Sequence, residues 1–445
     1  MATKFTSESD NLDCNVDCNR KRWRQLILGI LCMAMIANLQ YGWTLFVVPL
    51  HQAQGWGLAA IQVAFTLFVA LETWTTPLSG WIADKLGPDR GPRVVISAGG
   101  VLVALGWTIV SRANSLPVLY FGNALAGLGA GAVYVTCLGL VSKWFKDNRG
   151  LAVGLVAAGF GGGAALTVIP VREVIGAEGY RFAFLLFALI QGGVCLLAAQ
   201  FMRNPHPGEA PALKAVTVKQ ISHSYSPPEM LRQPMFWVLY ILNFIVLAAG
   251  FTVAANVASL AQSYGVANVV IWGTTALSVG LIFANISDAV GRPFFGWVGD
   301  RIGRPPAMAI AFAGSAASYY LMSVTEHHPF GFIFFVGMIF FCWGAIFSLF
   351  PSMCTDLFGP QYATTNLGFL YTSKGAASFM VPLGTYLVTV TDSWNSVLYL
   401  GAGLQVLGII VALALLWPAE HRHHTKIEGR AERVAQTPPL LKKAG

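Results

Sequence analysis

Residues 77–87 read PLSGWIADKLG, and residues 293–303 repeat the pattern as PFFGWVGDRIG. Both copies keep a glycine, a tryptophan, an aspartate, a basic residue and a second glycine at the same spacing. These positions are Gly80, Trp81, Asp84, Lys85 and Gly87 in the first copy, and Gly296, Trp297, Asp300, Arg301 and Gly303 in the second. A repeat of this kind within one chain indicates two related halves.

Each copy follows a long apolar segment, and its residue types suit a contact between helices. A glycine lets a second helix approach closely, and a carboxylate can pair with a basic residue or with the start of another helix. We therefore expect the glycines, aspartates and basic residues of both copies to form a gate. The gate would hold one side of a membrane protein closed and release it during function.

The composition places most of the chain in lipid. Of the 445 residues, 55% are hydrophobic and only 11% are charged, whereas a soluble domain carries about 25% charged residues. Twelve stretches are apolar over the roughly 20 residues that a span requires. They are approximately residues 24–48, 59–83, 93–112, 117–143, 150–170, 180–202, 235–263, 270–299, 306–324, 329–352, 364–390 and 396–418.

A long polar segment rich in proline, serine and histidine separates the sixth span from the seventh. We therefore predict an all-α membrane protein of twelve transmembrane helices in two six-helix bundles related by the repeat. The predicted parts are a tail at 1–23, a bundle at 24–202, a linker at 203–234, a second bundle at 235–418 and a tail at 419–445.

The distribution of lysine and arginine predicts the orientation. One side carries only Arg112, Arg172 and Arg181, in loops or at the ends of spans, and all other basic loop and tail residues fall on the opposite side. Because basic loops stay inside, we expect both termini in the cytoplasm of a bacterial cell, with the chain in its inner membrane. Residues 1–20 are polar, so the first helix is not read as a cleaved signal peptide.

Several other classes of protein do not fit the sequence. The net charge of +8 is spread over short loops, which argues against nucleic-acid binding. Walker A, HExxH and GxSxG strings do not occur, so we expect a carrier and not an enzyme. Five of the seven cysteines lie in apolar segments, and we expect no disulfide, metal or cofactor. The tail contains IEGR, residues 427–430, which matches a protease-site linker.

The repeated pattern resembles the signature loop of the major facilitator superfamily. Longer strings resemble the oxalate:formate antiporter family within it, which is related to the monocarboxylate transporters. They are LQYGWTLFVVP (39–49), IQVAFTLF (61–68), GAVYV (131–135), KWFKDNRGLAVGLVAAGFGGG (143–163), LRQPMFWVL (231–239), GRPFFGWVGDRIGR (291–304), FCWGAIFSLFPS (341–352) and LGFLYTSKGAAS (367–378). The resemblance implies an alternating-access carrier of a small carboxylate, bound by Arg292 and Lys374.

Arg292 and Lys374 lie within apolar spans, roughly 12–15 Å from one membrane face. A charge there costs at least about 2.5 kcal/mol and is tolerated mainly beside a cavity or a counter-ion. Asp288 precedes Arg292 by one helical turn, but the sequence offers no evident partner for Lys374. Arginine binds one carboxylate bidentately and lysine suits a second, so the pair matches a small dicarboxylate such as oxalate. In the structural alternative, one of the two cations belongs to a salt bridge between helices.

Glu72 and Asp288 occupy equivalent positions in the two halves, and both are intramembrane acids. Animal monocarboxylate transporters resemble the chain here, with an acid one turn before the arginine, and some couple transport to protons. Both acids are therefore candidate proton carriers. In the structural alternative, Glu72 is capped by Thr73 or Thr76, and Asp288 is held by Arg292.

Aromatic and amide side chains complete the candidate site. Positions that match substrate-site residues of the family are Gln40, Tyr41, Tyr134, Trp343 and Tyr371. The chain departs from the family at Phe160 and Phe347, which replace tyrosines, and at Tyr371, which replaces a tryptophan. We expect polar tips to bind carboxylate oxygens while the rings exclude water.

The sequence favours oxalate:formate exchange, with proton-coupled symport of formate, lactate or pyruvate as the alternative. The expected partners are the small carboxylate and the lipid bilayer, and we expect a monomer. A channel or receptor is the competing class of membrane protein, and saturable counter-transport would distinguish a carrier from either.

Overall fold

A computed structural model describes residues 6–207, 209–210, 224–254, 256–418 and 420, and these residues are mostly helical. The first half contains α1 (Thr6–Tyr41), α2 (Thr44–Gln54), α3 (Leu58–Trp74), α4 (Thr76–Lys85), α5 (Gly87–Ser111), α6 (Leu116–Trp144), α7 (Arg149–Glu178) and α8 (Tyr180–Ala199). The short α9 (Pro227–Leu231) precedes the second half.

The second half contains α10 (Pro234–Ala254), α11 (Val257–Ser263), α12 (Ala276–Ile302), α13 (Arg304–Val324), α14 (Pro329–Gly344), α15 (Ile346–Phe358), α16 (Ala363–Ser378), α17 (Met380–Thr391), α18 (Asn395–Ile410) and the π-helical η1 (Val411–Leu416). Before α12, the strands β1 (Val270–Ile271) and β2 (Thr274–Thr275) pair antiparallel in a small hairpin.

Several predicted spans are divided into two consecutive helices. The second span, for example, consists of α3 and α4, and Pro77 lies in the first turn of α4, where its missing N–H removes no helical hydrogen bond. Within the described residues, nine segments have the length and apolarity of a membrane span. Two of the other three predicted spans are interrupted helices, α3 with α4 and α16 with α17. The third, predicted at 270–299, begins with the β-hairpin and becomes helical only at α12, which carries charged residues.

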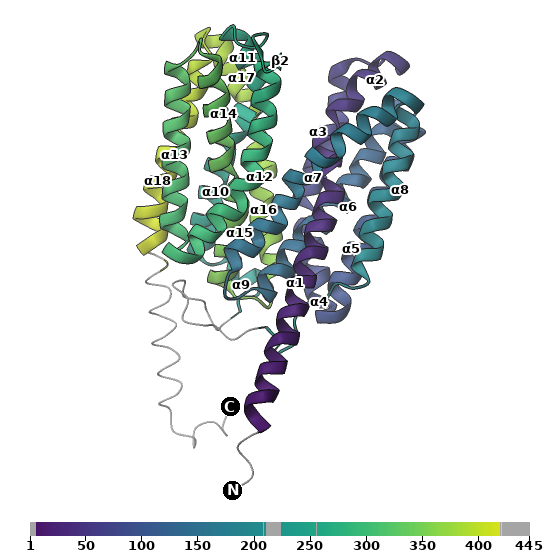
Figure 1. Cartoon of the computed structure of the whole chain (residues 1–445), viewed down its shortest axis with the longest axis vertical. Helices are drawn as coiled ribbons and strands as arrows, with labels where there is room; N and C mark the ends of the chain where they lie inside the picture. Colours follow the sequence, from purple (N-terminus) through teal and green to yellow (C-terminus); the bar gives the residue numbers. More distant parts are fainter. Residues whose placement is uncertain (1–5, 208, 211–223, 255, 419, 421–445) are drawn as a thin grey trace.

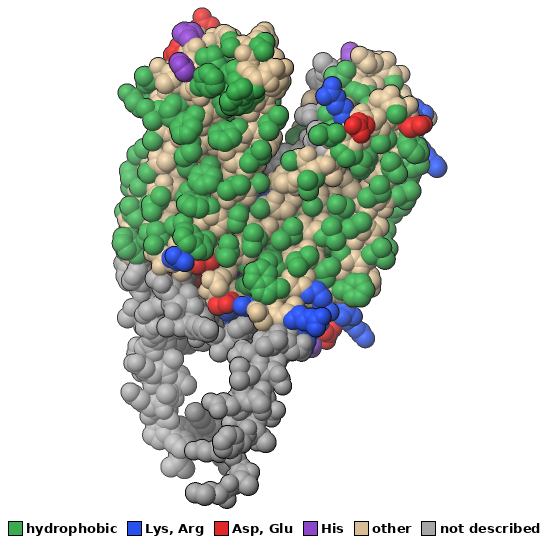
Figure 2. Space-filling view, viewed as in Figure 1, with side chains coloured by type: hydrophobic (Ala, Val, Ile, Leu, Met, Phe, Trp, Pro, Cys, Tyr) green, Lys and Arg blue, Asp and Glu red, His purple; other side chains and the backbone are tan. Residues whose placement is uncertain are grey.

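The helices form two bundles, α1–α8 and α10–α18, which confirms the predicted architecture (Figure 1). The bundles meet at the end that carries α4 and α9, and they diverge toward the end that carries α2 and α11. Figure 2 shows an open cleft between the bundles at the diverging end. It also shows hydrophobic side chains over the flanks and charged side chains gathered at the two ends, as a bilayer requires.

The described borders of the linker are each fixed to the neighbouring bundle. The carbonyl oxygen of Arg203 accepts a hydrogen bond of 2.8 Å from Trp144 Nε1, and hydrogen bonds from the Arg203 guanidinium lower the pKa of Glu209 to about 2. On the other side, Tyr225 N donates to the carbonyl oxygen of Phe358 at 2.9 Å. We call this end of the molecule the linker end. Residues 211–223 and 421–445 lie outside the described part, and the domain boundaries stay a prediction.

Asp300 joins the bundles on one side of the linker end. Its carboxylate accepts hydrogen bonds of 2.9 and 2.8 Å from the backbone N–H groups of residues 150–151, which have no intrahelical partner at the start of α7. Arg304 lies 2.7 Å from Asp300 and 3.0 Å from Asp356. Asp356 in turn pairs with Arg149 of the first bundle.

Asp84 performs the equivalent task on the other side. It accepts hydrogen bonds from Thr365 N at 2.8 Å and Thr365 Oγ1 at 2.7 Å, at the start of α16. Lys143 Nζ lies 2.6 Å from Asp84 Oδ1. The basic residues of the repeated motif itself lie elsewhere, because Lys85 covers the ring of Trp81 at 4.4 Å and Arg301 covers the ring of Trp297 at 4.1 Å.

The motif glycines explain how the bundles approach so closely at the linker end. A Cβ atom on Gly296 would collide with the backbone oxygen of Gly150, and one on Gly80 would collide with the backbone oxygen of Thr364. No side chain fits between α7 and α12, or between α4 and α16, at these points. The linker end closes only with glycine there.

We expect Gly296→Val to shift the protein toward a state open at the linker end, since the closed contact no longer fits. A cysteine at Leu138, in a background without other reactive thiols, should then react faster with a maleimide added from the linker side. Gly193→Val is the matched control, because a Cβ there meets nothing within 4 Å. Equal labelling rates in the two variants would contradict the role assigned to Gly296.

Candidate functional site

Lys374 is buried between the bundles and is surrounded by polar atoms from three helices. Its Nζ lies 3.3 Å from Glu72 Oε2 of α3, 3.3 Å from Gln40 Oε1 of α1 and 2.8 Å from Tyr371 Oη. Tyr371 Oη also donates to Glu72 Oε1 at 3.4 Å. Lys374 is 3% exposed and Glu72 is fully buried, so the two charges neutralise each other away from water.

For Lys374 this pairing is the structural alternative, a salt bridge between helices, and for Glu72 it replaces the threonine cap. Lys374 has a protein partner, and Glu72 is not capped by a neighbouring threonine. The hydroxyl of Thr73 donates to the carbonyl oxygens of Val69 and Ala70 instead. The hydroxyl of Thr76 donates to the carbonyl oxygens of Thr73 and Gly368. A threonine within a helix readily bonds to a carbonyl oxygen of the preceding turn.

Arg292 forms the second ion pair, and here the expected partner is confirmed. Its Nη2 lies 2.6 Å from Asp288 Oδ2, one turn earlier on α12, and its Nε lies 3.3 Å from Asp288 Oδ1. A third bond of 2.7 Å runs from Nη1 to the carbonyl oxygen of Ala157 on α7. The guanidinium is therefore fixed by both bundles, although its counter-ion comes from its own helix.

Arg292 and Lys374 both contact the same turn of α7. Ala157 accepts the hydrogen bond from Arg292, and the ring of Phe160, three residues later and on the same face, lies 5.8 Å from Lys374 Nζ. On the side of the second bundle, the ring of Phe347 lies 4.4 Å from the Arg292 guanidinium carbon. Aromatic faces stabilise both cations in addition to the carboxylates.

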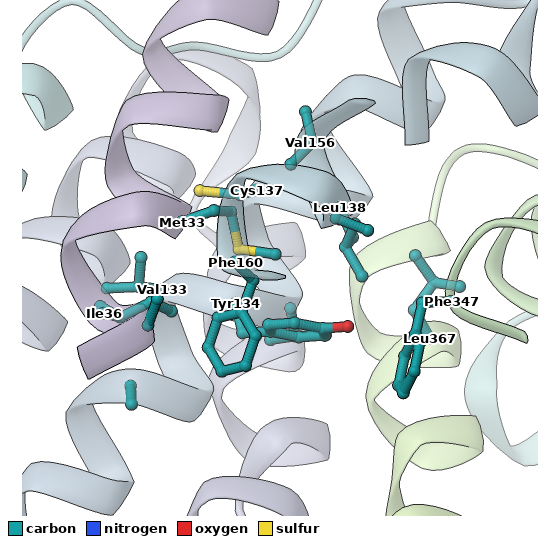
Figure 3. Packing of buried hydrophobic residues seen from close by; sticks show 14 of the residues in the cluster. Met33, Ile36, Val133, Tyr134, Cys137, Leu138, Val156, Phe160, Phe347 and Leu367 are labelled. Carbon is teal, nitrogen blue, oxygen red and sulfur yellow. The ribbon is translucent and has the colours of Figure 1, made fainter. Parts of the chain in front are cut away.

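Aromatic rings from both bundles pack around this pair of charges. Tyr134 of α6 stacks on Tyr371 of α16 with ring centroids 4.5 Å apart, and it meets Phe160 edge to face at 5.4 Å. Figure 3 shows the Tyr134 hydroxyl directed across the interface toward Phe347 and Leu367 of the second bundle. The predicted site residues Tyr134, Tyr371 and Lys374 therefore lie together.

One further predicted residue, Trp343, belongs to α14 of the second bundle. Trp343 packs edge to face against Phe347 at 5.3 Å, and its buried Nε1 has no hydrogen-bond partner within the described part of the chain. The side chain of Tyr41 lies outside the described residues. Ala157 was missed by sequence reasoning because it contributes only a backbone oxygen, and no side-chain pattern indicates that.

The chain matches the family description "Major Facilitator Superfamily" over residues 27–287 and 239–444. It belongs to the major facilitator superfamily. The oxalate:formate antiporter of Oxalobacter formigenes is 36% identical over 377 residues, which cover 84% of this chain and 87% of that protein. Monocarboxylate transporter 12-B of Danio rerio is 24% identical over 351 residues, covering 73% of each chain.

The solved structures agree with this assignment of the fold. The human organic anion transporter MFSD10 superposes with a TM-score of 0.64 at 15% identity, covering 88% of this chain and 98% of that one. These matches are transport proteins, in line with the expectation of a carrier and not an enzyme. In this major facilitator protein, the candidate site lies where the two bundles meet.

The pairing of Glu72 with Lys374 generates a prediction about stability. Glu72→Gln or Lys374→Met alone leaves one buried charge unpaired, and each should lower the free energy of unfolding by about 3 kcal/mol or more. The double variant should lose much less than the sum of the two. Thermal unfolding in detergent measures all three, with exposed Glu173→Gln as the control; strictly additive losses would show that the ion pair does not form.

Proposed function

We propose that the protein is an alternating-access carrier that takes up a small monocarboxylate together with a proton. The observation that carries the proposal is the charge balance of four buried groups. Arg292 and Lys374 are matched by Asp288 and Glu72, so the four groups sum to zero when all are ionised. A bound monoanion adds one negative charge, and one proton restores neutrality, which a poorly hydrated site strongly favours.

Glu72 is the group best placed to receive that proton. Protonation removes the carboxylate charge that holds Lys374, and the ammonium group can then bind the carboxylate of the substrate. After release on the other side, Glu72 loses its proton and the ion pair re-forms. The site without substrate is again neutral. The carrier can then reopen to the first side without burying an unpaired cation on the way.

Arg292 provides the second contact for the substrate carboxylate. Asp288 and the carbonyl of Ala157 hold the guanidinium in one orientation, so little entropy is lost when the anion arrives. Gln40, Tyr134 and Tyr371 supply polar groups around the same space, while Trp343 and Phe347 complete its apolar wall.

Oxalate:formate exchange is the second candidate function. The relative that is 36% identical to this chain carries that name, and the long matching strings include both cations. The sequence alone ranks exchange first, but that ranking depends on an unpaired Lys374. A dianion beside four groups that already sum to zero would need two protons or the displacement of both carboxylates.

The rest of the assignment follows from charge and shape. We place the chain as a monomer in a bacterial inner membrane, with the basic linker end and both termini in the cytoplasm. The contacts of Asp84 and Asp300 then close the cytoplasmic side, and the cleft opens away from the cytoplasm. In this arrangement, the gate must open before the substrate can leave inward.

The experiment that tests the proposal uses protein reconstituted in liposomes. Uptake of labelled formate, lactate, pyruvate and oxalate is measured with and without an inwardly directed proton gradient, and with empty or preloaded vesicles. We expect the gradient to accumulate monocarboxylates in empty vesicles, relative to protein-free vesicles. Oxalate uptake that needs internal formate and ignores the gradient would favour exchange.

Glu72→Gln should separate exchange from coupling. The amide mimics the protonated acid, so anion binding and exchange should persist near the wild-type rate. Net uptake driven by the gradient should fall at least about tenfold, because the empty site keeps an unpaired cation. Asp288→Asn is measured beside it. Loss of coupling in that variant alone would identify Asp288, and not Glu72, as the proton carrier.

Arg292→Lys should weaken carboxylate binding by at least about tenfold although the charge is kept. A lysine cannot bond to Asp288, to the Ala157 carbonyl and to a substrate carboxylate with the geometry of the planar guanidinium. Binding is measured as substrate-induced thermal stabilisation of the purified protein. An unchanged response to substrate would place Arg292 outside the site.

A further inference from the structure

A small cavity lies beside Lys374, between the two bundles. Its volume is about 30 Å³, and it is bounded by α6, α10, α15 and α16. The walls are mostly carbon, contributed by side chains such as Leu138, Leu247, Phe350 and Leu367. Lys374, Tyr371 and Tyr134 also line it.

The cavity extends from the ion pair toward the linker end. On α6, Leu138 lies one turn beyond Tyr134 in the direction of Trp144, where that helix ends at the linker end. On α16, Leu367 lies about two turns from Lys374 toward Ala363, where that helix begins. A substrate that enters through the cleft therefore reaches the charged groups first and the cavity second.

We propose that this cavity is the subsite for the alkyl tail of the carried monocarboxylate, an inference that rests on the proposed function. The carboxylate meets Lys374 and Arg292, and the tail points away from the cleft into the cavity. A volume of about 30 Å³ accommodates roughly two water-sized groups. The favoured substrates are monocarboxylates with one or two carbons beyond the carboxyl group.

The walls of the cavity exclude a charged tail. Asn243 is the one polar residue on the α10 side of the lining, and its Nδ2 already donates to Ser373 Oγ at 2.7 Å. A second carboxylate placed among leucine and phenylalanine side chains would lose most of its hydration. Formate leaves the cavity empty, acetate and propionate fill it, and a dicarboxylate is rejected from it.

The test measures binding of a tail series to the purified full-length carrier. Formate, acetate, propionate, butyrate and oxalate are titrated separately, and the concentration that gives half of the maximal thermal stabilisation is recorded. We expect acetate or propionate to bind at least about tenfold more tightly than formate, the effect of a methyl group in a fitted apolar pocket. Oxalate should bind more weakly than acetate.

Leu138→Ala enlarges the cavity and should improve butyrate binding at least about tenfold relative to formate binding. Leu140→Ala is the matched control, since Leu140 is a buried leucine on the same helix and is not part of the cavity lining in the described structure. If Leu138→Ala does not fold, Leu367→Val, which removes one methylene group, should change the preference in the same direction.

The outcomes separate this inference from the function on which it rests. No stabilisation by any carboxylate would overturn the proposed function itself. Stabilisation by all five acids with equal affinity, or with the same tail preference in Leu138→Ala and Leu140→Ala, would leave a carboxylate carrier and overturn the tail subsite. Tightest binding of oxalate would overturn the subsite and favour dicarboxylate exchange.

Discussion

A buried cation in a lipid-embedded protein requires a counter-charge, and the central part of this structure is arranged to supply two. Lys374 finds Glu72 across the bundle interface, and Arg292 finds Asp288 one turn away on its own helix. Aromatic rings close around both pairs and keep them from water. The carrier therefore presents a neutral resting site, and a negatively charged substrate disturbs that balance unless a proton accompanies it.

The two halves form the same type of contact at the linker end, but with different additional ion pairs. In each half, an aspartate at the end of a helix accepts hydrogen bonds from the start of a helix in the other bundle, which glycine contacts bring close. Asp300 adds Arg304, Asp356 and Arg149 to this arrangement. Asp84 has Lys143 from its own bundle, so its links to the second bundle are hydrogen bonds alone.

Much of the fold could be predicted from the sequence, because apolar length and the repeated motif report directly on spans and halves. The Asp288–Arg292 pair was also predictable, since a spacing of four residues places both on one helical face. Glu72 and Lys374 lie far apart in the chain, and no local pattern indicates that α3 and α16 are neighbours. The hydrogen bond from Arg292 to a backbone oxygen is equally invisible in side-chain patterns.

The two ion pairs differ in how their distances respond to a rotation of the bundles. Asp288 and Arg292 travel together on one rigid helix, so rotation of the bundles leaves their distance constant. Glu72 and Lys374 belong to different bundles, and separating α3 from α16 stretches their bond directly. In the proposed transport cycle, the arrival of a proton or an anion at this one contact changes the link between the two bundles.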